Sequence, residues 1–210
     1  MLVGEPQLQQ HTGLPTRVAV YIDGFNLFYG LRDKGWRRYY WLDVRTLAGR
    51  LLRPGQSLAF VRYFTARVLS APDDPDKPNR QNTYLEALAT LPNLSIHYGY
   101  FMPRRGGGYE EKMTDVNIAV ELLCDAHADA FDTAILVSGD SDLTSALLAV
   151  RERYGKRVVV AFPPARRSAV LGEAARASIA VERSALRDSQ LPDRVTGVAG
   201  ISVERPTEWS

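Results

Sequence analysis

Apolar residues along the chain follow two patterns, short continuous runs and longer stretches with one apolar face. The short runs are rich in β-branched residues and end at turn signals, which is typical of strands buried on both faces of a parallel sheet. The longer stretches repeat apolar residues every three to four positions, which indicates amphipathic helices. The predicted strands are residues 17–22, 57–66, 94–101, 133–137, 157–162 and 178–181. The predicted helices are residues 27–31, 44–52, 80–90, 112–128, 142–154 and 168–175.

The order of these elements predicts the fold class. Strands that alternate with helices of ~10–15 residues are connected by right-handed crossovers, and they form a parallel sheet with helices on both faces. We therefore expect an α/β fold with three layers around a central, mainly parallel sheet. One domain is predicted over residues 16–183. Residues 1–15 are expected to be a flexible lead-in, and the polar, aperiodic residues 184–210 a weakly ordered tail.

Composition indicates where in the cell the protein is expected but says little about its function. With 26 Lys and Arg against 24 Asp and Glu, the formal net charge of +2 is too small to indicate a polyanionic partner by itself. The single cysteine, Cys124, excludes a disulfide scaffold and favours a cytoplasmic protein. No apolar run approaches the ~20 residues of a membrane-spanning helix, and the first residues lack a signal-peptide pattern. We expect no membrane association.

Carboxylates follow two of the predicted strands. Asp23 comes directly after strand 17–22, Asp140 and Asp142 come after strand 133–137, and Asp115 begins the helix that leads into the second strand. The carboxyl ends of parallel strands meet at one sheet edge, where open α/β sheets bind ligands, so we expect the four carboxylates to converge. Two carboxylates ~4 Å apart repel by about 4 kcal/mol at an effective dielectric near 20. A divalent ion such as Mg²⁺ or Mn²⁺ is the natural compensating charge.

Each carboxylate also has a purely structural interpretation. Asp23 precedes a glycine and could form a turn, while Asp140 and Asp142 could serve as turn and N-cap residues. One cap needs only one Asp, which favours metal binding for the pair. Asp115, in the first turn of a helix, would be stabilised by the helix dipole without any chemistry. For Asp115 the pattern alone favours that structural interpretation.

Three motifs give the chain a resemblance to a known family. They are Val-Tyr-Ile-Asp-Gly-Phe-Asn at 20–26, Glu-Lys-Met-Thr-Asp-Val-Asn-Ile-Ala-Val-Glu-Leu-Leu at 111–123, and Ile-Leu-Val-Ser-Gly-Asp-Ser-Asp-Leu at 135–143. In this order, and at these strand ends and helix start, they resemble the NYN domain family over about residues 17–182. This is a PIN-like branch whose bacterial members are often grouped as LabA-like proteins. The resemblance implies a PIN-like α/β sandwich and metal-dependent cleavage of RNA.

The resemblance also implies roles for individual residues. The family's acidic positions, which would bind one or two Mg²⁺ or Mn²⁺ ions and catalyse hydrolysis, are matched by Asp23, Asp115, Asp140 and Asp142. For Asp115 this reverses the structural interpretation. The polar positions of the motifs, which would contact the RNA phosphate, a metal-bound water or the scissile group, are matched by Asn26, Lys112 and Ser138.

Two positions depart from the family pattern. Family members often carry Asp where this chain has Glu121, and Phe where it has Leu143. Leu143 is a tolerable exchange of one core residue for another. Glu121 follows Asp115 by six residues, which is about 600° of helix, so the two side chains do not share a helix face. Glu121 is therefore left out of the predicted site.

The sequence contains one candidate track for single-stranded RNA, residues 32–41, which mix cations with aromatic rings. The alternative, which is favoured, is that Trp36, Tyr39 and Trp41 pack beside a helix while the arginines face solvent. Arg104 and Arg105 could contact phosphate or simply belong to a basic loop.

The predicted function is a metal-dependent ribonuclease with a Mg²⁺ or Mn²⁺ cofactor. Its partner would be RNA, single-stranded or structured, and a homodimer is left open. A non-catalytic RNA-binding or regulatory module of the same fold is the alternative. A phosphohydrolase of the haloacid-dehalogenase type is disfavoured, because Phe25 stands where that chemistry needs a second Asp.

Overall fold

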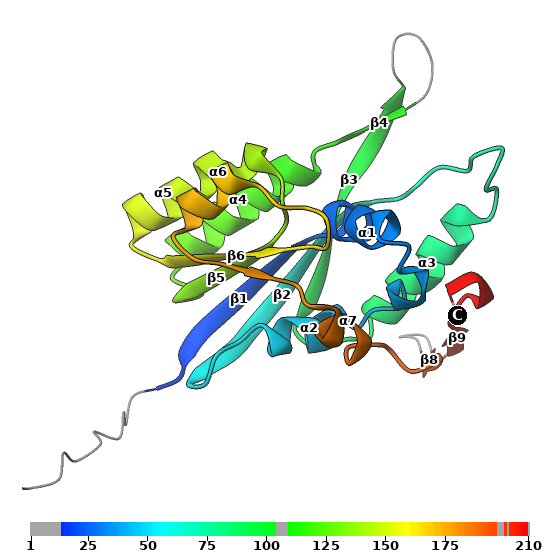
Figure 1. The fold of residues 1–210 in the computed structure, drawn as a ribbon, viewed down its shortest axis with the longest axis horizontal. Helices are drawn as coiled ribbons and strands as arrows, with labels where there is room; N and C mark the ends of the chain where they lie inside the picture. Colours follow the sequence, from blue (N-terminus) through cyan, green and yellow to red (C-terminus); the bar gives the residue numbers. More distant parts are fainter. Residues whose placement is uncertain (1–13, 104–108, 197–199, 201, 210) are drawn as a thin grey trace, which may run out of the picture.

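The sheet is the framework of the molecule. A computed structural model describes residues 14–103, 109–196, 200 and 202–209 (Figure 1). These residues form a seven-stranded sheet in the order β4-β3-β2-β1-β5-β6-β7 and a separate two-stranded sheet, β8-β9. The strands are β1 (Thr16–Asp23), β2 (Gln56–Ala66), β3 (Leu94–Pro103), β4 (Tyr109–Lys112), β5 (Thr133–Val137), β6 (Arg157–Phe162), β7 (Ser178–Ala180), β8 (Arg194–Thr196) and β9 (Ser202–Glu204). All neighbours in the large sheet are parallel except β3 and β4.

Helices cover both faces of the large sheet, as the sequence predicted. They are α1 (Gly24–Asp33), α2 (Val44–Arg50), α3 (Lys77–Leu88), α4 (Thr114–His127), α5 (Thr144–Tyr154), α6 (Ala169–Ala175) and α7 (Arg183–Arg187), with 3₁₀ helices η1 (Arg37–Tyr39), η2 (Ser141–Leu143) and η3 (Thr207–Trp209). One core cluster packs α1, α2, α3 and α7 against the sheet, and a second packs α4, α5 and α6 against the other face (Figure 1). The α/β fold with a mostly parallel central sheet is confirmed.

The topology reverses at the centre of the sheet. Strand β1 pairs with β2 on one side and with β5 on the other. The chain therefore builds the sheet in one direction through β2 and β3, and returns through α4 to the far side of β1. In open α/β sheets, such a switch point opens a crevice at the carboxyl ends of the two central strands. Three of the predicted aspartates lie at this edge, Asp23 at the end of β1 and Asp140 and Asp142 after β5.

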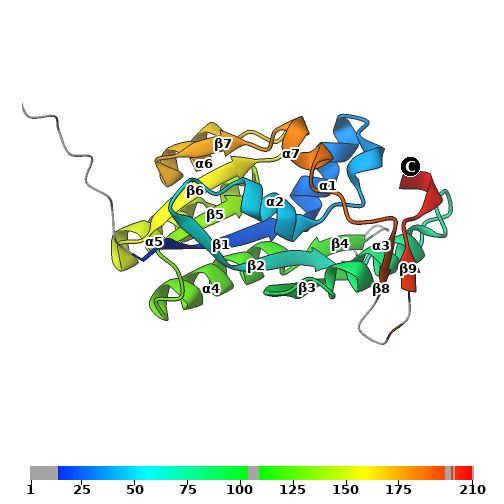
Figure 2. The same cartoon turned by 90° about the horizontal axis from the view of Figure 1, so that it is seen from below.

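The C-terminal residues differ from the weakly ordered tail predicted for 184–210. Part of α7, the β8–β9 pair and η3 lie in this stretch, and the hairpin and η3 lie beside α3 in both views (Figure 2). Leu186, Leu191 and Trp209 are buried and belong to the first core cluster. These few apolar residues are too far apart in sequence to form a periodic pattern, so their burial could not be predicted from periodicity.

Two further predictions concern the aromatic segment at residues 32–41 and the basic loop that contains Arg104 and Arg105. The packing interpretation of the aromatic segment is confirmed for Tyr39 and Trp41, which are buried, and the Trp41 Nε1 donates to the Pro192 carbonyl at 2.8 Å. Arg104 and Arg105, proposed as a phosphate contact or a basic loop, lie outside the described residues. Among the helices of the described residues, none is both long and apolar enough to span a bilayer.

Candidate functional site

Asp23 ends β1 and begins α1. Its Oδ1 accepts a hydrogen bond from the Asn26 backbone N–H at 2.9 Å, so it is the N-cap of the helix. Its Oδ2 accepts a hydrogen bond from the Ser138 hydroxyl, also at 2.9 Å. The side chain is only 4% exposed. The structural interpretation of Asp23 as a turn residue therefore explains its capping of α1. It does not explain the burial of the side chain, because a helix cap can lie at the surface.

The turn after β5 is tied to the turn after β1. The Asp140 N–H donates to Ser138 Oγ at 3.0 Å, and the Gly139 N–H donates to Asn26 Oδ1 at 2.9 Å. Asp140 Oδ1 in turn accepts from the Asp142 N–H at 2.9 Å and caps η2. Asn26 and Ser138 thus fix the two strand ends to each other. Ser138 is fully buried, and its hydroxyl holds the Asp23 carboxylate in place.

A pocket of about 220 Å³ opens where these turns meet the start of α4. We call it the acidic pocket; it is lined by Asp23, Phe25, Asn26, Tyr29, Glu111, Thr114, Asp115, Asp140 and Arg166. The structure thus brings together Asp23, Asp115 and Asp140 from three separate parts of the chain. Asp142 and Lys112 are exposed and do not line the pocket.

Sequence reasoning missed two charged residues that line the acidic pocket, Glu111 and Arg166. Glu111 lies in β4 and accepts hydrogen bonds from the Thr114 N–H at 3.1 Å and from the Thr114 hydroxyl, so it caps α4. Arg166 lies in the turn after β6 and forms an ion pair with Asp33. Both had a signal in the sequence: Glu111 opens the second motif, and Arg166 follows a strand that ends at the same sheet edge.

The turn that carries Arg166 is wedged between two glycines. A Cβ on Gly139 would lie 2.4 Å from the Arg166 carbonyl oxygen, and a Cβ on Gly30 would lie 2.5 Å from the Pro164 carbonyl oxygen. Real side chains do not tolerate such distances, so only glycine fits at both positions. The close approach places Arg166 beside the carboxylates.

Two carboxylates of the acidic pocket have raised pKa values. Burial raises the pKa of Asp23 from 3.8 to about 7, and the charges of Asp115 and Asp140 add to that rise. Burial also raises the pKa of Asp115 to about 6, with further contributions from Asp140, Glu111 and Asp142. Asp142 therefore acts on the site through its charge although it does not line the pocket. Across the described ranges, no Lys or Arg forms an ion pair with these aspartates.

The donor atoms of the acidic pocket suit a hard divalent ion. All are oxygens of carboxylates, an amide or a hydroxyl, which is the donor set of Mg²⁺ and Mn²⁺. In the positions that the side chains occupy, however, no three Asp, Glu, His or Cys residues of the described chain are close enough to share one ion. The chemistry of the donors fits the ion, while a complete ligand sphere is not formed in this arrangement.

Glu121 belongs to a different group of charges on the same helix. Its Oε2 lies 3.2 Å from Arg62 Nη1, and its Oε1 lies 3.5 Å from His97 Nδ1. Arg62 also donates two hydrogen bonds of 2.6 Å to Asp125, which accepts a third from the Tyr21 hydroxyl at 2.7 Å. We call these five residues the paired cluster. Glu121 is held there by the Arg62 cation and the His97 ring, away from the residues that line the acidic pocket.

The chain was compared with known proteins. It matches the NYN domain over residues 17–182. It is 28% identical over 190 residues to 6-hydroxy-3-succinoylpyridine 3-monooxygenase HspA of Pseudomonas putida, covering 71% of this chain and 60% of HspA, so it spans less than two thirds of that relative. It is 26% identical over 152 residues to the low amplitude and bright protein LabA of Synechococcus elongatus, covering 70% of this chain and 74% of LabA.

A solved structure shares the fold. The crystal structure of a protein of unknown function from Vibrio parahaemolyticus superposes with a TM-score of 0.60 at 21% identity, covering 87% of this chain and all (100%) of that one. The NYN match spans the whole large sheet and includes each aspartate of the acidic pocket. The chain therefore belongs to the NYN domain family, with LabA as a distant homologue.

Proposed function

We propose that this protein is a ribonuclease that hydrolyses RNA phosphodiester bonds in the acidic pocket with the help of Mg²⁺ or Mn²⁺. The NYN domain is a PIN-like domain associated with ribonucleases, and nucleases of this family typically use divalent metal ions. The observation that carries the proposal is the set of converging carboxylates without cation partners in the described chain, at the topological switch point of the sheet. The hydrogen bonds to Asp23 and Asp140 stabilise the two turns, but in the described chain no cation compensates for the repulsion among the carboxylates.

The residues of the pocket have distinct parts in the proposed reaction. Asp23 is fixed by Asn26 and Ser138, so its carboxylate is pre-oriented. Asp115 reaches the same pocket from the start of α4, where it would hold the ion together with Asp23 and Asp140. Arg166 supplies positive charge at the rim for the phosphate. A divalent ion, when bound by these carboxylates, would supply a water of lowered pKa and charge for the leaving oxygen.

The sequence also predicted roles for Lys112 and Asp142. Both are exposed near the pocket mouth rather than inside it. Lys112 would contact the RNA beside the scissile bond, and Asp142 would complete the negative field and could reach a second ion. These two roles remain part of the proposal.

The proposal is tested by incubating the protein with a panel of single-stranded and structured RNAs in Mg²⁺, Mn²⁺ or chelator. Asp140→Asn keeps an oxygen acceptor for the Asp142 N–H and therefore the η2 cap, while it removes the charge. We expect it to lower the cleavage rate on the order of 100-fold or more. Asp129→Asn, at an exposed ion pair with Lys156 and Arg17, is the matched control and should cleave normally. Equal cleavage by wild type and Asp140→Asn would contradict the proposal.

A non-catalytic RNA-binding module is the alternative from the same family. It would bind RNA equally well with chelator present and would leave every RNA of the panel intact. The similarity to HspA gives another candidate, oxidation of a hydroxylated pyridine. Oxygen-dependent turnover of 6-hydroxy-3-succinoylpyridine with a reductant, retained in Asp140→Asn, would favour that activity over the nuclease.

A further inference from the structure

A second and larger cavity lies next to the acidic pocket. It has a volume of about 450 Å³, which is within the range of small-molecule sites. It is enclosed by α1, the end of β2, the start of α3 and the C-terminal Trp209. We call it the aromatic pocket, because its walls include Phe25, Phe28, Tyr29, Tyr40, Tyr84 and Trp209. Nothing in the proposed cleavage reaction uses this space.

The two pockets share a wall. Phe25 and Tyr29, on one side of α1, line both of them. Gly24, which follows Asp23 directly, also lines the aromatic pocket. A Cβ at Gly24 would lie 2.6 Å from the Tyr63 hydroxyl, so α1 starts in direct contact with β2. A ligand in the aromatic pocket would therefore lie one side chain away from the carboxylates.

The rings form a continuous row that leads away from the acidic pocket. Phe25 stacks on Tyr29 with ring centres 6.1 Å apart, and Tyr29 meets Phe28 at 5.5 Å. Phe28 meets Tyr40 at 4.8 Å, and Tyr40 meets Trp209 at 5.8 Å. Phe25, Phe28 and Tyr29 are only half-buried and belong to neither core cluster. These three rings serve as pocket walls and not as core, and each is partly exposed.

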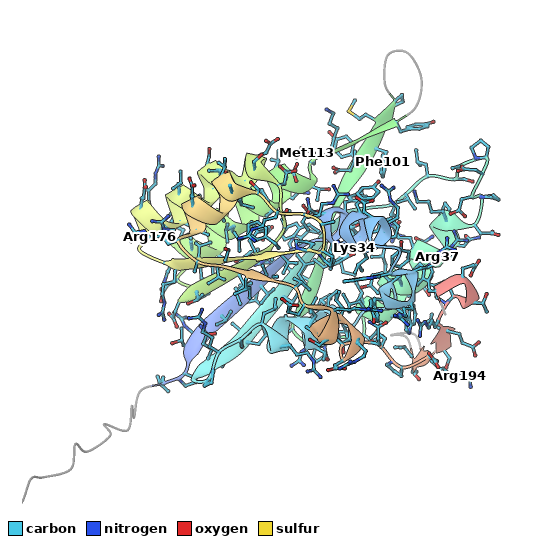
Figure 3. All side chains as sticks on the ribbon, viewed as in Figure 1. Lys34, Arg37, Phe101, Met113, Arg176 and Arg194 are labelled. Atoms are coloured by element: carbon cyan, nitrogen blue, oxygen red, sulfur yellow. The ribbon has the colours of Figure 1, made fainter. Side chains whose placement is uncertain are left out.

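Cations line the same space. The Arg32 guanidinium lies 4.5 Å from the centre of the Tyr29 ring. Arg80 is already paired with Asp74 and Glu208. Arg37 is exposed, lines the pocket, and has no ion pair with a carboxylate anywhere in the described ranges (Figure 3). Lys77 lines the pocket as well, and the described residues give it no ion pair either, so Arg37 and Lys77 are the cations that remain for an anionic ligand.

We propose that the aromatic pocket holds one unstacked base of a single-stranded RNA, with Arg37 on a neighbouring phosphate and the strand continuing into the acidic pocket. This inference rests on the proposed function, because it assumes RNA as the substrate. Ring walls stack on any base face, and unstacked bases occur in single strands and loops rather than in duplexes. The pocket thus selects single-stranded over double-stranded RNA.

Binding measured without cleavage tests the inference. Fluorescence anisotropy of a short, labelled single-stranded RNA is recorded in chelator for wild type and for Phe28→Leu, which removes the ring but keeps apolar volume. We expect Phe28→Leu to weaken binding at least about fivefold, and Phe28→Tyr to restore it. Tyr154→Leu removes a half-buried ring on α5, outside the pocket, and is the matched control; it should bind as wild type does.

The salt dependence of binding separates the ring from the cation. Arg37→Gln should lower the slope of log affinity against log salt by about 0.7, the value for one phosphate contact to a single strand. Phe28→Leu should leave that slope unchanged, because stacking releases no counterions. An RNA that carries one abasic site at successive positions should show one position of weakened binding to the wild-type protein, and this readout does not depend on any variant folding.

The outcomes distinguish the inference from the proposed function. If Phe28→Leu, Arg37→Gln and the abasic RNAs bind as their references do, the base subsite is wrong, whatever the cleavage assay shows. If these changes weaken binding but no RNA is cleaved in Mn²⁺, the subsite holds and the nuclease fails. Equal affinity for duplex and single strand, no RNA binding at all, or capture of a free pyridine carboxylate in place of RNA would overturn the subsite.

Discussion

Helix α4 contributes acidic side chains to two places that differ in how their charge is compensated. At its N-terminus, Asp115 faces Asp23 and Asp140 in the acidic pocket, and the described residues supply no ion pair to any of them. Farther along the helix, Glu121 and Asp125 are bound by Arg62, with His97 and Tyr21 completing the paired cluster. One helix thus carries both unpaired and fully paired carboxylates.

The two places differ in whether the charge of the carboxylates stabilises the fold or is left for a ligand to compensate. In the paired cluster, burial lowers the pKa of Arg62, but the hydrogen bonds and charge of Asp125 outweigh that effect and leave the pKa raised. Every polar group there has a partner, as stability requires. In the acidic pocket, burial raises the pKa of Asp23 and Asp115 and mutual repulsion adds to the rise, while the hydrogen bonds from Asn26 and Ser138 offset only part of it at Asp23. Charge that costs stability is expected where a ligand compensates for it.

The largest effect is expected from breaking the paired cluster. Asp125→Ala leaves the Arg62 guanidinium and the Tyr21 hydroxyl without their acceptor inside the fold. Removing one partner of a buried pair should lower the free energy of unfolding by about 3–5 kcal/mol, measured by urea denaturation. The cleavage rate per folded molecule should be unchanged. Loss of cleavage without loss of stability would show that Asp125 acts in the reaction and not in stabilising the fold.

Asp23→Asn is expected to stabilise the protein, whereas Asp125→Ala is expected to destabilise it. The folded protein holds a proton on Asp23 up to about pH 7, whereas the unfolded chain releases it near 3.8. Between these values the native state binds more protons, so this carboxyl makes stability fall as pH rises, and the full cost is present above pH 7. Asp23→Asn should therefore raise the free energy of unfolding at pH 8 without added metal, by at most about 4 kcal/mol. At pH 4 wild type and variant should unfold alike, and a variant less stable at pH 8 would refute the raised pKa.

Divalent ions should stabilise the protein through the acidic pocket alone. Mn²⁺ at ~100 times its dissociation constant would add about 2.7 kcal/mol to the free energy of unfolding. Thermal unfolding with and without Mn²⁺ measures this directly, and Asp115→Asn should respond much less. Glu121→Gln, in the paired cluster, should respond as wild type does. An equal response from Asp115→Asn would mean that the ion binds elsewhere.

The smallest effect is expected from Glu121→Gln itself. The Glu121 side chain is 31% exposed, and its contacts with Arg62 and His97 are secondary to the Arg62–Asp125 pair. Partly exposed ion pairs contribute about 0–1 kcal/mol, so urea denaturation should show a shift within that range. A loss as large as that of Asp125→Ala would show that the two carboxylates act as one unit.

The periodicity of the sequence was enough to predict the fold and the meeting of Asp23 and Asp140. Strand boundaries followed from apolar runs bounded by turn residues, and the parallel arrangement then placed the ends of β1 and β5 side by side. That step needs only topology, because every strand of a parallel sheet presents its carboxyl end to the same edge. Asp115 needed the family motif as well, since its place in a helix also has a structural explanation.

Residues whose position depends on tertiary packing could not be predicted in this way. Glu111 reaches the acidic pocket because β4 pairs antiparallel with β3, and no local pattern indicated that strand. Ser138 stands in a motif that implies chemistry, yet its burial makes it a positioning residue. The aromatic pocket combines α1 with Trp209, which lies far away in the sequence. Such contacts are decided by how distant segments pack.

The close packing of the Arg166-bearing turn against Gly30 and Gly139 positions one wall of the acidic pocket by shape. The turn that bears Arg166 fits against the backbone only because Gly30 and Gly139 lack side chains. The site is therefore sensitive to mutation at these glycines. A single added carbon at either one would displace Arg166 from the wall of the acidic pocket without changing any of its carboxylates, so an inactive variant there would have lost the spacing of the site and not its chemical groups.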